Sequence, residues 1–181
     1  MKIVYLVISF FVLAISCFAQ KHERWNVKTL SDGFIPDLSH PKKVTVASMA
    51  AIRRNKGVRN NQPRLNFEKT VIKITGTITR IQLEKGTTAK PGDMDYHIEI
   101  SDGTLTDSTL VCEAADPNDV AIAHSTEKVR IKKVRDGVKN LKVGDRVVFT
   151  GIEFEDKIHS PSPNRTRNFI EMHPILIAKK L

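Results

Sequence analysis

Cysteine is scarce in this chain, and its scarcity excludes the disulfide-stapled class of small exported proteins. The sequence holds two cysteines, Cys17 and Cys112, in 181 residues. Cleavage of a predicted leader after Ala19 removes the first, and a lone Cys112 cannot form an internal disulfide. Because Cys112 follows Val111 in an apolar run, we interpret it as a small buried hydrophobic residue rather than a reactive thiol. The fold must therefore depend on packing for its stability.

Aromatic residues are also few, at 6% of the chain with one tryptophan and two tyrosines. Proteins that bind single-stranded nucleic acid stack bases on several exposed aromatic side chains interleaved with basic residues. The sequence predicts no such surface, and Tyr96 falls on the apolar side of its predicted strand. The formal net charge of +9 attracts polyanions in general, but its sign does not choose among them. We therefore expect that nucleic acid is not a partner.

Internal repeats, low-complexity tracts and long apolar runs are lacking, except for one run at the start of the chain. Residues 3–18 are almost wholly apolar, and Ala19 supplies the small residue that signal peptidase requires. The run is short for a membrane span, which needs about 20 residues. We predict a signal peptide at 1–19, no transmembrane segment in the mature chain, and a periplasmic or secreted protein. Acylation of Cys17 as a lipoprotein is the less favoured alternative, because Ala14 stands where a branched aliphatic residue is usual.

Residues 20–66 are predicted to form an N-terminal arm with a short helix and a basic loop. The alternation in Arg24–Asp32 indicates a short strand or an extended arm. Thr45 is placed to cap a helix from Val46 to about Arg54. Residues 53–64 are rich in arginine, lysine and asparagine, and we interpret them as a solvated loop rather than a polyanion-binding patch.

Residues 67–181 are long enough for one domain with a hydrophobic core, and we expect a monomer. Strands are predicted at 71–83, 95–101, 109–114, 146–155 and 168–177. The apolar parity of the first strand changes after Ile78, which indicates a bulge or bend near Gly76. A helix is predicted at 116–136, starting at Asp116 and Pro117, stopping at Gly137, and with Lys128, Arg130, Lys132, Lys133 and Arg135 on a solvated face.

Three strands, a helix and two further strands are the order of an OB-fold. We therefore predict a mainly β protein, an OB-like five-stranded Greek-key barrel with a helix between strands 3 and 4. A long, bent first strand suits such a barrel because that strand pairs at both ends of the closed sheet. The alternative is an open α+β sheet made of the same elements.

Five polar residues occupy positions where the strand pattern would permit apolar ones: Asp95, His97, His159, Glu171 and His173. Within each strand the i, i+2 spacing puts two side chains on one face about 7 Å apart. Imidazoles and carboxylates are ligands of zinc, manganese and iron, and Asp93, Glu113 and Asp156 are candidates to orient the imidazoles. Lys28 and Asp32 of the arm are further candidates for this site.

Other interpretations of these residues remain open. They could bind an anion, or act as general acid and base. They could also form a hydrogen-bonded network that only holds the barrel ends in place. No spacing among them is a diagnostic metal motif.

Four motifs resemble those of a family of uncharacterised exported bacterial proteins. They are Arg-x-x-Val-Lys-Thr-Leu-Ser-Asp at 24–32, Asp-x-Asp-x-His at 93–97, Gly-x-x-Phe-x-Asp-x-x-His at 151–159 and Asn-x-Ile-Glu-x-His-Pro at 168–174. The resemblance covers nearly all of the mature chain. It departs at 160–167, where the family often has glycine-rich sequence. It implies an exported domain with a polar cluster, and it implies no reaction.

The sequence thus favours an exported single-domain binding protein with a divalent-metal or anion site, in which zinc or manganese would be the cofactor. One alternative is a metal-dependent hydrolase of the phosphoesterase kind, with His97, His159 or His173 as the base. Another is a structural or interaction protein of the cell envelope. Whether the protein is an enzyme stays open at this point.

Overall fold

The computed structural model of the protein describes residues 24–53, 58–59, 62–86, 92–106, 108–157 and 168–181. The predicted signal peptide and the candidate ligand His159 lie outside these ranges. Within them, none of the helices is both long and apolar enough to cross a membrane. In chain order the elements are α1 (Trp25–Lys28), β1 (Lys42–Lys43), α2 (Val46–Ala50), η1 (Phe67–Lys69), β2 (Val71–Leu83), β3 (Tyr96–Ser101), β4 (Leu110–Ala114), η2 (Val120–His124), α3 (Lys128–Val138), β5 (Arg146–Glu155) and β6 (Ile170–Lys180).

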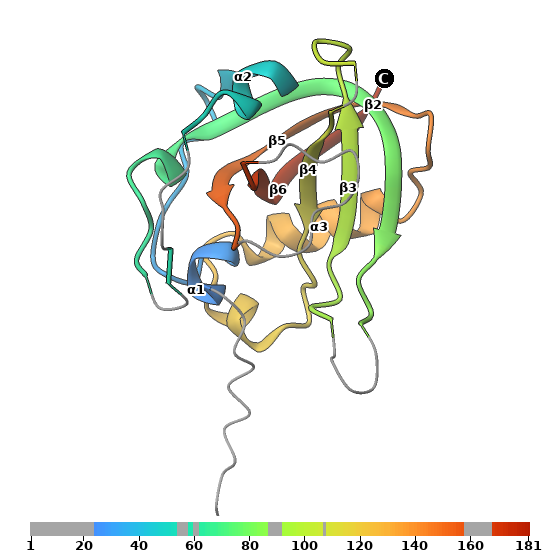
Figure 1. Cartoon of the computed structure of the whole chain (residues 1–181). Coiled ribbons are helices and arrows are strands. Elements are labelled where there is room, and N and C mark those ends of the chain that lie inside the picture. Colours follow the sequence, from blue (N-terminus) through green and yellow to red (C-terminus); the bar gives the residue numbers. More distant parts are fainter. Residues whose placement is uncertain (1–23, 54–57, 60–61, 87–91, 107, 158–167) are drawn as a thin grey trace, which may run out of the picture.

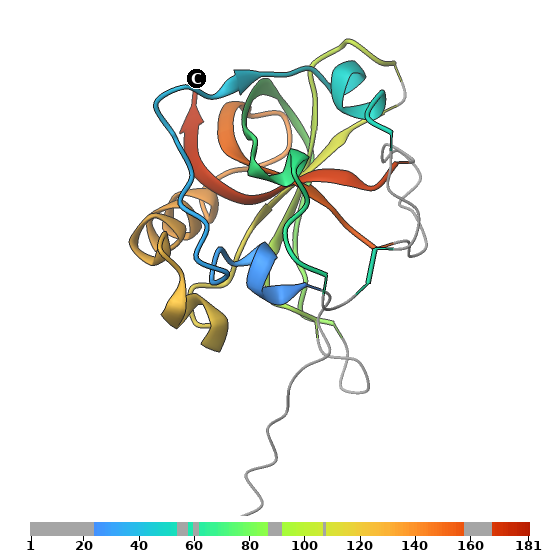
Figure 2. The same ribbon diagram turned by 90° about the vertical axis from the view of Figure 1, so that its left-hand side faces the viewer.

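Five of the strands close into a barrel. The sheet order is β1-β2-β3-β4-β6-β5, and β2 also pairs with β5, which closes the ring. Strand β4 runs parallel to β6, whereas the other pairs within the ring are antiparallel. This is the strand order of an OB-fold, so the predicted architecture is confirmed. Figure 1 shows β2 sweeping around the barrel, and Figure 2 shows α1 against its side.

Strand β2 is long because it belongs to both ends of the ring. Its residues 71–77 pair with β5, and its residues 77–83 pair with β3. The register shifts between Ile78 and Arg80, which is the irregularity that the change of parity predicts. At Gly76 an added Cβ would lie 2.7 Å from the backbone oxygen of Ser101. Only glycine therefore allows β3 to approach this closely.

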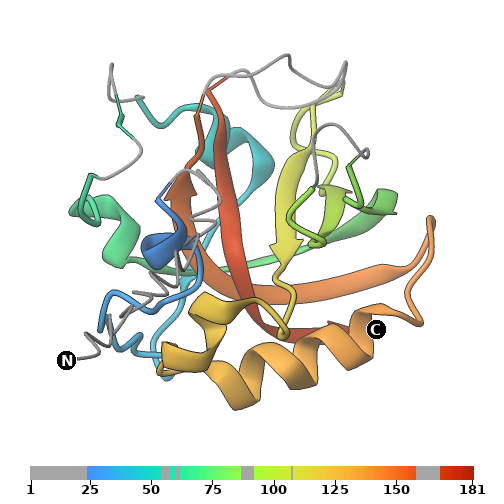
Figure 3. The ribbon, with the colours of Figure 1, turned by 90° about the horizontal axis from the view of Figure 1, so that it is seen from below.

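The apolar side chains form two clusters on opposite sides of the barrel wall. The larger fills the barrel, and α3 closes one end of it with Val134 and Val138 (Figure 3). The smaller lies outside the wall. Ile72 of β2 points into the barrel, and its neighbour Val71, which belongs to the smaller cluster, points to the opposite face of the strand. The smaller cluster consists of Leu30, Val71, Ala115, Ile122, Ile131, Ile152 and Leu176, so the arm, η2 and α3 pack against the outside of the strands.

The arm is helical where the sequence predicts extended backbone. Its first element is α1, with Thr29 Oγ1 donating to the Trp25 carbonyl at 2.9 Å. Val27 and Leu30 are both buried, and their spacing of three residues suits a helical turn. The prediction of a strand there is wrong, because apolar residues three positions apart fit a helical turn as well as an alternation that changes phase.

Helix α2 begins where it was predicted, and the longer helix does not. Thr45 caps α2 through its hydrogen bond from the Ser48 amide at 3.0 Å, although α2 ends at Ala50. Asp116 starts no helix: its side chain accepts from the Asn118 amide in a turn, and the segment divides into η2 and α3. Helix α3 also runs past Gly137, and β6 runs from Ile170 to Lys180 rather than over 168–177.

Candidate functional site

Strand β4 lies between β3 and β6, and this order decides which of the predicted residues meet. Its register pairs Glu113 directly with His97 of β3. On the other side, Cys112 pairs with Met172 of β6. Glu113 follows Cys112 on β4 and His173 follows Met172 on β6, so the side chains of Glu113 and His173 also lie on one face of the sheet. Glu113 therefore lies between two imidazoles that come from the strands on either side of it.

The face that these residues share is the outer one. Cys112 and Ala114 belong to the barrel core, so Glu113 between them points away from the interior. The same alternation along β3 and β6 places His97 and His173 on the outer face. All three are nevertheless buried, with exposed fractions of 5% for His97, 5% for Glu113 and 0% for His173. The candidate site is thus a covered patch on the outside of the barrel wall.

Glu113 is held by both imidazoles. Its Oε1 lies 3.1 Å from His97 Nδ1, and its Oε2 lies 2.8 Å from His173 Nδ1. Burial alone lowers the pKa of an imidazole, but hydrogen bonds with Glu113 and neighbouring carboxylates outweigh it. They raise the pKa of His97 to about 11 and the pKa of His173 to about 10. Burial raises the pKa of Glu113, but its hydrogen bonds with His173 and His97 outweigh this and hold it well below the ordinary value.

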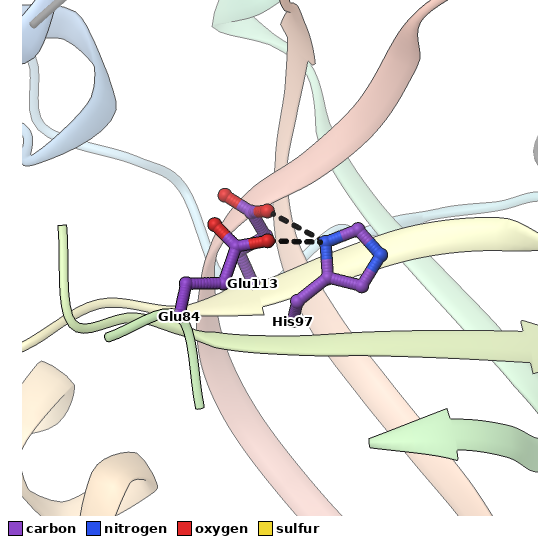
Figure 4. Close-up of side chains that lie close together, drawn as sticks. All are labelled: Glu84, His97 and Glu113. Carbon is purple, nitrogen blue, oxygen red and sulfur yellow. Dashed lines mark hydrogen bonds and ion pairs between the residues drawn. The ribbon is translucent and has the colours of Figure 1, made fainter. Parts of the chain in front are cut away.

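Five side chains form what we call the carboxylate–histidine cluster: Glu84, Asp95, His97, Glu113 and His173. They make two groups that share Glu113, one with Glu84 and His97, the other with Asp95 and His173. In each group the candidate ligand atoms lie within 4.8 Å of one another. In the first group, both carboxylates turn toward the same nitrogen of the His97 ring (Figure 4).

Three buried side-chain atoms of this cluster make no hydrogen bond with any residue that the structure describes: Asp95 Oδ2, His97 Nε2 and His173 Nε2. Asp95 Oδ2 and His173 Nε2 lie 3.5 Å apart, and neither makes a hydrogen bond with any residue that the structure describes. His97 Nε2 likewise makes none among those residues, although Glu99 Oε1 lies 3.4 Å away. Glu171 Oε1 completes the surroundings at 3.7 Å from His173 Nδ1. Buried polar atoms are nearly always hydrogen-bonded, whereas the two Nε2 nitrogens make only long ion pairs with Glu99 and Asp95 while the rings are protonated.

A backbone amide fixes the Asp95 carboxylate, and Arg135 fixes the segment just before Asp95. Its Oδ1 accepts from the Asp116 amide at 2.7 Å. Arg135 of α3 donates to the carbonyls of Met94 and Ala114 at 2.5 and 2.8 Å, and so ties the segment before β3 to the end of β4. Arg135 is buried, and its predicted place on a solvated helix face is wrong.

Asp93 lies next to this group and adds to its negative charge. Its Oδ1 accepts from the Asp95 amide at 3.1 Å. Burial raises the pKa of both carboxyls, and the charge of a neighbouring carboxylate raises each further, Glu113 acting on Asp93 and Asp93 acting on Asp95.

Lys28 of α1 brings a positive charge to the cluster from the arm. Its Nζ lies 3.9 Å from Glu113 Oε2 and 3.8 Å from Asp156 Oδ1. Burial opposes the charged form, but Asp156 and Glu113 outweigh it and raise the pKa of Lys28 well above its ordinary value. Of the two arm residues considered from the sequence, Lys28 therefore joins this region. Asp32 does not, because its carboxylate pairs with Arg64 at 2.8 Å.

Glu84 is the residue of the cluster that sequence reasoning missed. It follows β2, and its amide donates to the Asp95 carbonyl at 2.9 Å, which extends the hairpin beyond β3. Gln82 pairs with His97, and Glu84 is two residues further on, so it lies on the same face. The alternation of β2 contains this signal, but the 86–92 loop leaves the register between the two strands undetermined.

Both groups present donor atoms that could hold a divalent metal ion. Each offers one imidazole and two carboxylates, a mixture of nitrogen and oxygen donors that suits zinc, manganese or iron. The predicted residues Asp95, His97, Glu171 and His173 are brought together, with Asp93, Glu113 and Asp156 around them. His159 lies outside the described residues.

Comparisons with known proteins give fold neighbours only. No protein-family model matches the chain, and no curated protein does. Among solved structures, an OBody bound to hen egg-white lysozyme is 12% identical over 64% of this chain and 85% of its own, with a TM-score of 0.42. The Stn1–Ten1 complex of S. pombe is 14% identical over 61% and 57%, with a TM-score of 0.37. The asparaginyl-tRNA synthetase of Entamoeba histolytica is 15% identical over 78% and 23%, with a TM-score of 0.43.

Proposed function

We propose that this protein is an exported single-domain binding protein that holds a divalent metal ion through Asp95 and His173 Nε2, with Glu113 orienting the His173 ring through Nδ1. One observation carries the proposal: Asp95 Oδ2 and His173 Nε2 are buried 3.5 Å apart without a hydrogen bond to any described residue. While the ring is protonated the two atoms form only this long ion pair, and a buried polar atom that lacks a hydrogen bond costs about 1–3 kcal/mol. A bound cation would remove that cost at both atoms. Export rests on the predicted signal peptide at 1–19.

The charge of the surroundings supports a cation over an anion. Asp95, Glu113 and Glu171 gather in one buried region with the half-buried Asp93 beside it, and Lys28 and the protonated rings of His97 and His173 supply the positive charge there. Several buried carboxylates repel one another unless protons or a cation intervene. An anion placed among them would add to that repulsion, so the anion-site interpretation is disfavoured.

The experiment that tests the proposal measures metal uptake. The protein, purified without an affinity tag and stripped with a chelator, is titrated with Zn²⁺ and Mn²⁺ by calorimetry. We expect saturable uptake that Asp95→Asn and His173→Ala each weaken at least tenfold. Circular dichroism checks that the variants fold, and Asp95→Asn keeps the shape of the side chain if His173→Ala unfolds.

An exposed histidine elsewhere in the chain supplies the matched control. His40 Nδ1 lies 3.1 Å from Asp37 Oδ2, and both side chains are well exposed. His40→Ala should leave the uptake unchanged. Absence of uptake by the folded wild type would contradict the proposal, as would an equal loss in His40→Ala. Either result would favour a structural or interaction role for the cluster.

A further inference from the structure

From the position of the positive charge on the protein, we infer that the end of the barrel covered by α3 docks on a membrane surface that carries anionic lipid headgroups. We call this region the basic face and define it as residues 127–146 and 178–181. The basic face contains none of the five residues of the carboxylate–histidine cluster, so the inference does not depend on the proposed metal site.

The basic face carries most of the net charge of the chain. It holds ten basic and three acidic residues, a formal charge of +7, whereas the whole chain carries +9. Arg135 is the buried member of the ten, and the other nine side chains are exposed. Charge of one sign that is concentrated at one end of a molecule indicates a partner of the opposite charge.

Two segments that are distant in the sequence form this face. Val147 pairs with Lys180, and the Leu181 amide donates to the Arg146 carbonyl at 2.9 Å, so the end of β6 lies beside the start of β5. Helix α3 packs against β6 and leads through a turn into β5. Figures 2 and 3 show α3 and the end of β6 on the same side of the barrel. The fold therefore gathers the basic residues of both segments on one side of the molecule.

Carboxylates within the basic face neutralise only part of its charge. Each of the three pairs with a basic residue of the same face. Asp136, for example, lies 3.0 Å from Lys132 Nζ and 2.9 Å from Lys139 Nζ. Five other exposed basic residues make no ion pair with any residue that the structure describes: Lys128, Lys133, Lys142, Arg146 and Lys179. Their charges face solvent and can attract an external anion.

The other side chains of the basic face favour a lipid surface over nucleic acid. No residue of the face is aromatic, so it offers nothing on which the bases of a single strand could stack. Val129 and Val143 are instead 84% and 59% exposed. Val129 and Lys133 are four residues apart on α3 and therefore lie on one side of the helix. Exposed apolar side chains among lysines suit the interface of an anionic bilayer, where the lysines meet headgroups and the apolar groups reach the acyl boundary.

Binding to vesicles tests the inference. The mature protein is sedimented with vesicles of phosphatidylcholine alone and with vesicles that also contain phosphatidylglycerol. We expect binding to the anionic vesicles only, and we expect added salt to weaken it because salt screens exposed charges. The double variant Lys128→Gln/Lys133→Gln should weaken binding by at least about tenfold, because each basic residue near an anionic surface contributes about fivefold.

The matched control removes the same charge from another part of the surface. Lys69 in η1 and Lys85 after β2 are exposed and lie outside the basic face. Lys69→Gln/Lys85→Gln should weaken binding by less than about threefold, and circular dichroism checks that both double variants fold. If Lys128→Gln/Lys133→Gln unfolds, Lys142→Gln/Lys179→Gln replaces it.

Three results would overturn the inference. Equal weakening by the test and control variants would show that the basic face is not the docking surface. Equal binding to the two kinds of vesicle, or no binding to either, would exclude anionic lipid as the partner. Tighter binding of a single-stranded oligonucleotide than of the anionic vesicles would assign the face to nucleic acid instead.

Discussion

Arg24 anchors the arm that carries Lys28 to the cluster, and replacing it with methionine should loosen the arm. Its guanidinium forms a two-pronged ion pair with Glu68, in which Nη1 donates to Oε1 at 2.6 Å and Nη2 donates to Oε2. The same group donates to the carbonyls of Gln62, Pro63 and Glu155 at 3.2, 3.2 and 3.3 Å. The side chains of Arg24 and Glu68 are 1% and 0% exposed, so water does not replace these bonds.

The expected cost follows from the charge that remains. Arg24→Met leaves the buried Glu68 carboxylate without its counter-ion, which typically costs about 3–5 kcal/mol. Glu68 still accepts from the amides of Leu65 and Glu155 at 2.7 and 3.0 Å, so we expect the lower half of that range. With a urea m-value of about 2 kcal/mol per molar, the unfolding midpoint should fall by about 1.5–2 M.

Urea unfolding at pH 7, followed by circular dichroism, measures this change. Arg130→Met is the matched control, because Arg130 pairs with Glu127 on the surface and is 45% exposed. It should change the stability by less than about 1 kcal/mol. Adding Glu68→Gln to Arg24→Met removes the unpaired charge and keeps one acceptor oxygen, so it should restore part of the loss. Equal effects of Arg24→Met and Arg130→Met would refute the reasoning.

Two further predictions concern the strands next to the cluster. Burial raises the pKa of Glu153 to about 7, so its contribution to stability is complete below the ordinary glutamate pKa and is lost as pH rises through 7. Glu153→Gln should therefore match the wild type at pH 4 and exceed its stability by an amount on the order of 2 kcal/mol at pH 8, as urea unfolding at the two pH values would show; equal stabilities at pH 8 would count against this. At Gly92 an added Cβ would lie 2.0 Å from the Glu84 carbonyl oxygen, so Gly92→Ala should displace the backbone at Glu84 and lower the free energy of unfolding by about 1–3 kcal/mol, measured by urea unfolding. Gly137→Ala, where the added Cβ meets nothing within 4 Å, is the control and should stabilise by about 0.5–1 kcal/mol.

The strands of the barrel were predictable from the sequence because apolar residues at every second position indicate a strand with one buried face. Strand β5 matches its predicted range of 146–155, and the change of parity after Ile78 locates the bulge in β2. Short helices were harder. Near α1 the buried residues Val27 and Leu30 are three positions apart. That spacing fits a helical turn and also a strand whose alternation changes phase, so it does not distinguish a helix from a strand.

The candidate site could be predicted in its parts and not in its arrangement. Periodicity places Asp95 and His97 on one face of their strand, and Glu171 and His173 on one face of theirs. Only the closed sheet order, with β4 between β3 and β6, makes Glu113 their common neighbour. Sequence reasoning gave Glu113 a supporting role for this reason, since nothing local distinguishes it as the residue that both histidines contact.

The position of a bound ion tests the central claim most directly. A crystal of the protein grown with Zn²⁺, measured on both sides of the zinc absorption edge, should show an anomalous peak within about 2.0–2.2 Å of Asp95 Oδ2 and His173 Nε2. Zinc found only on exposed histidines such as His40, with Asp95 and His173 unliganded, would contradict the account.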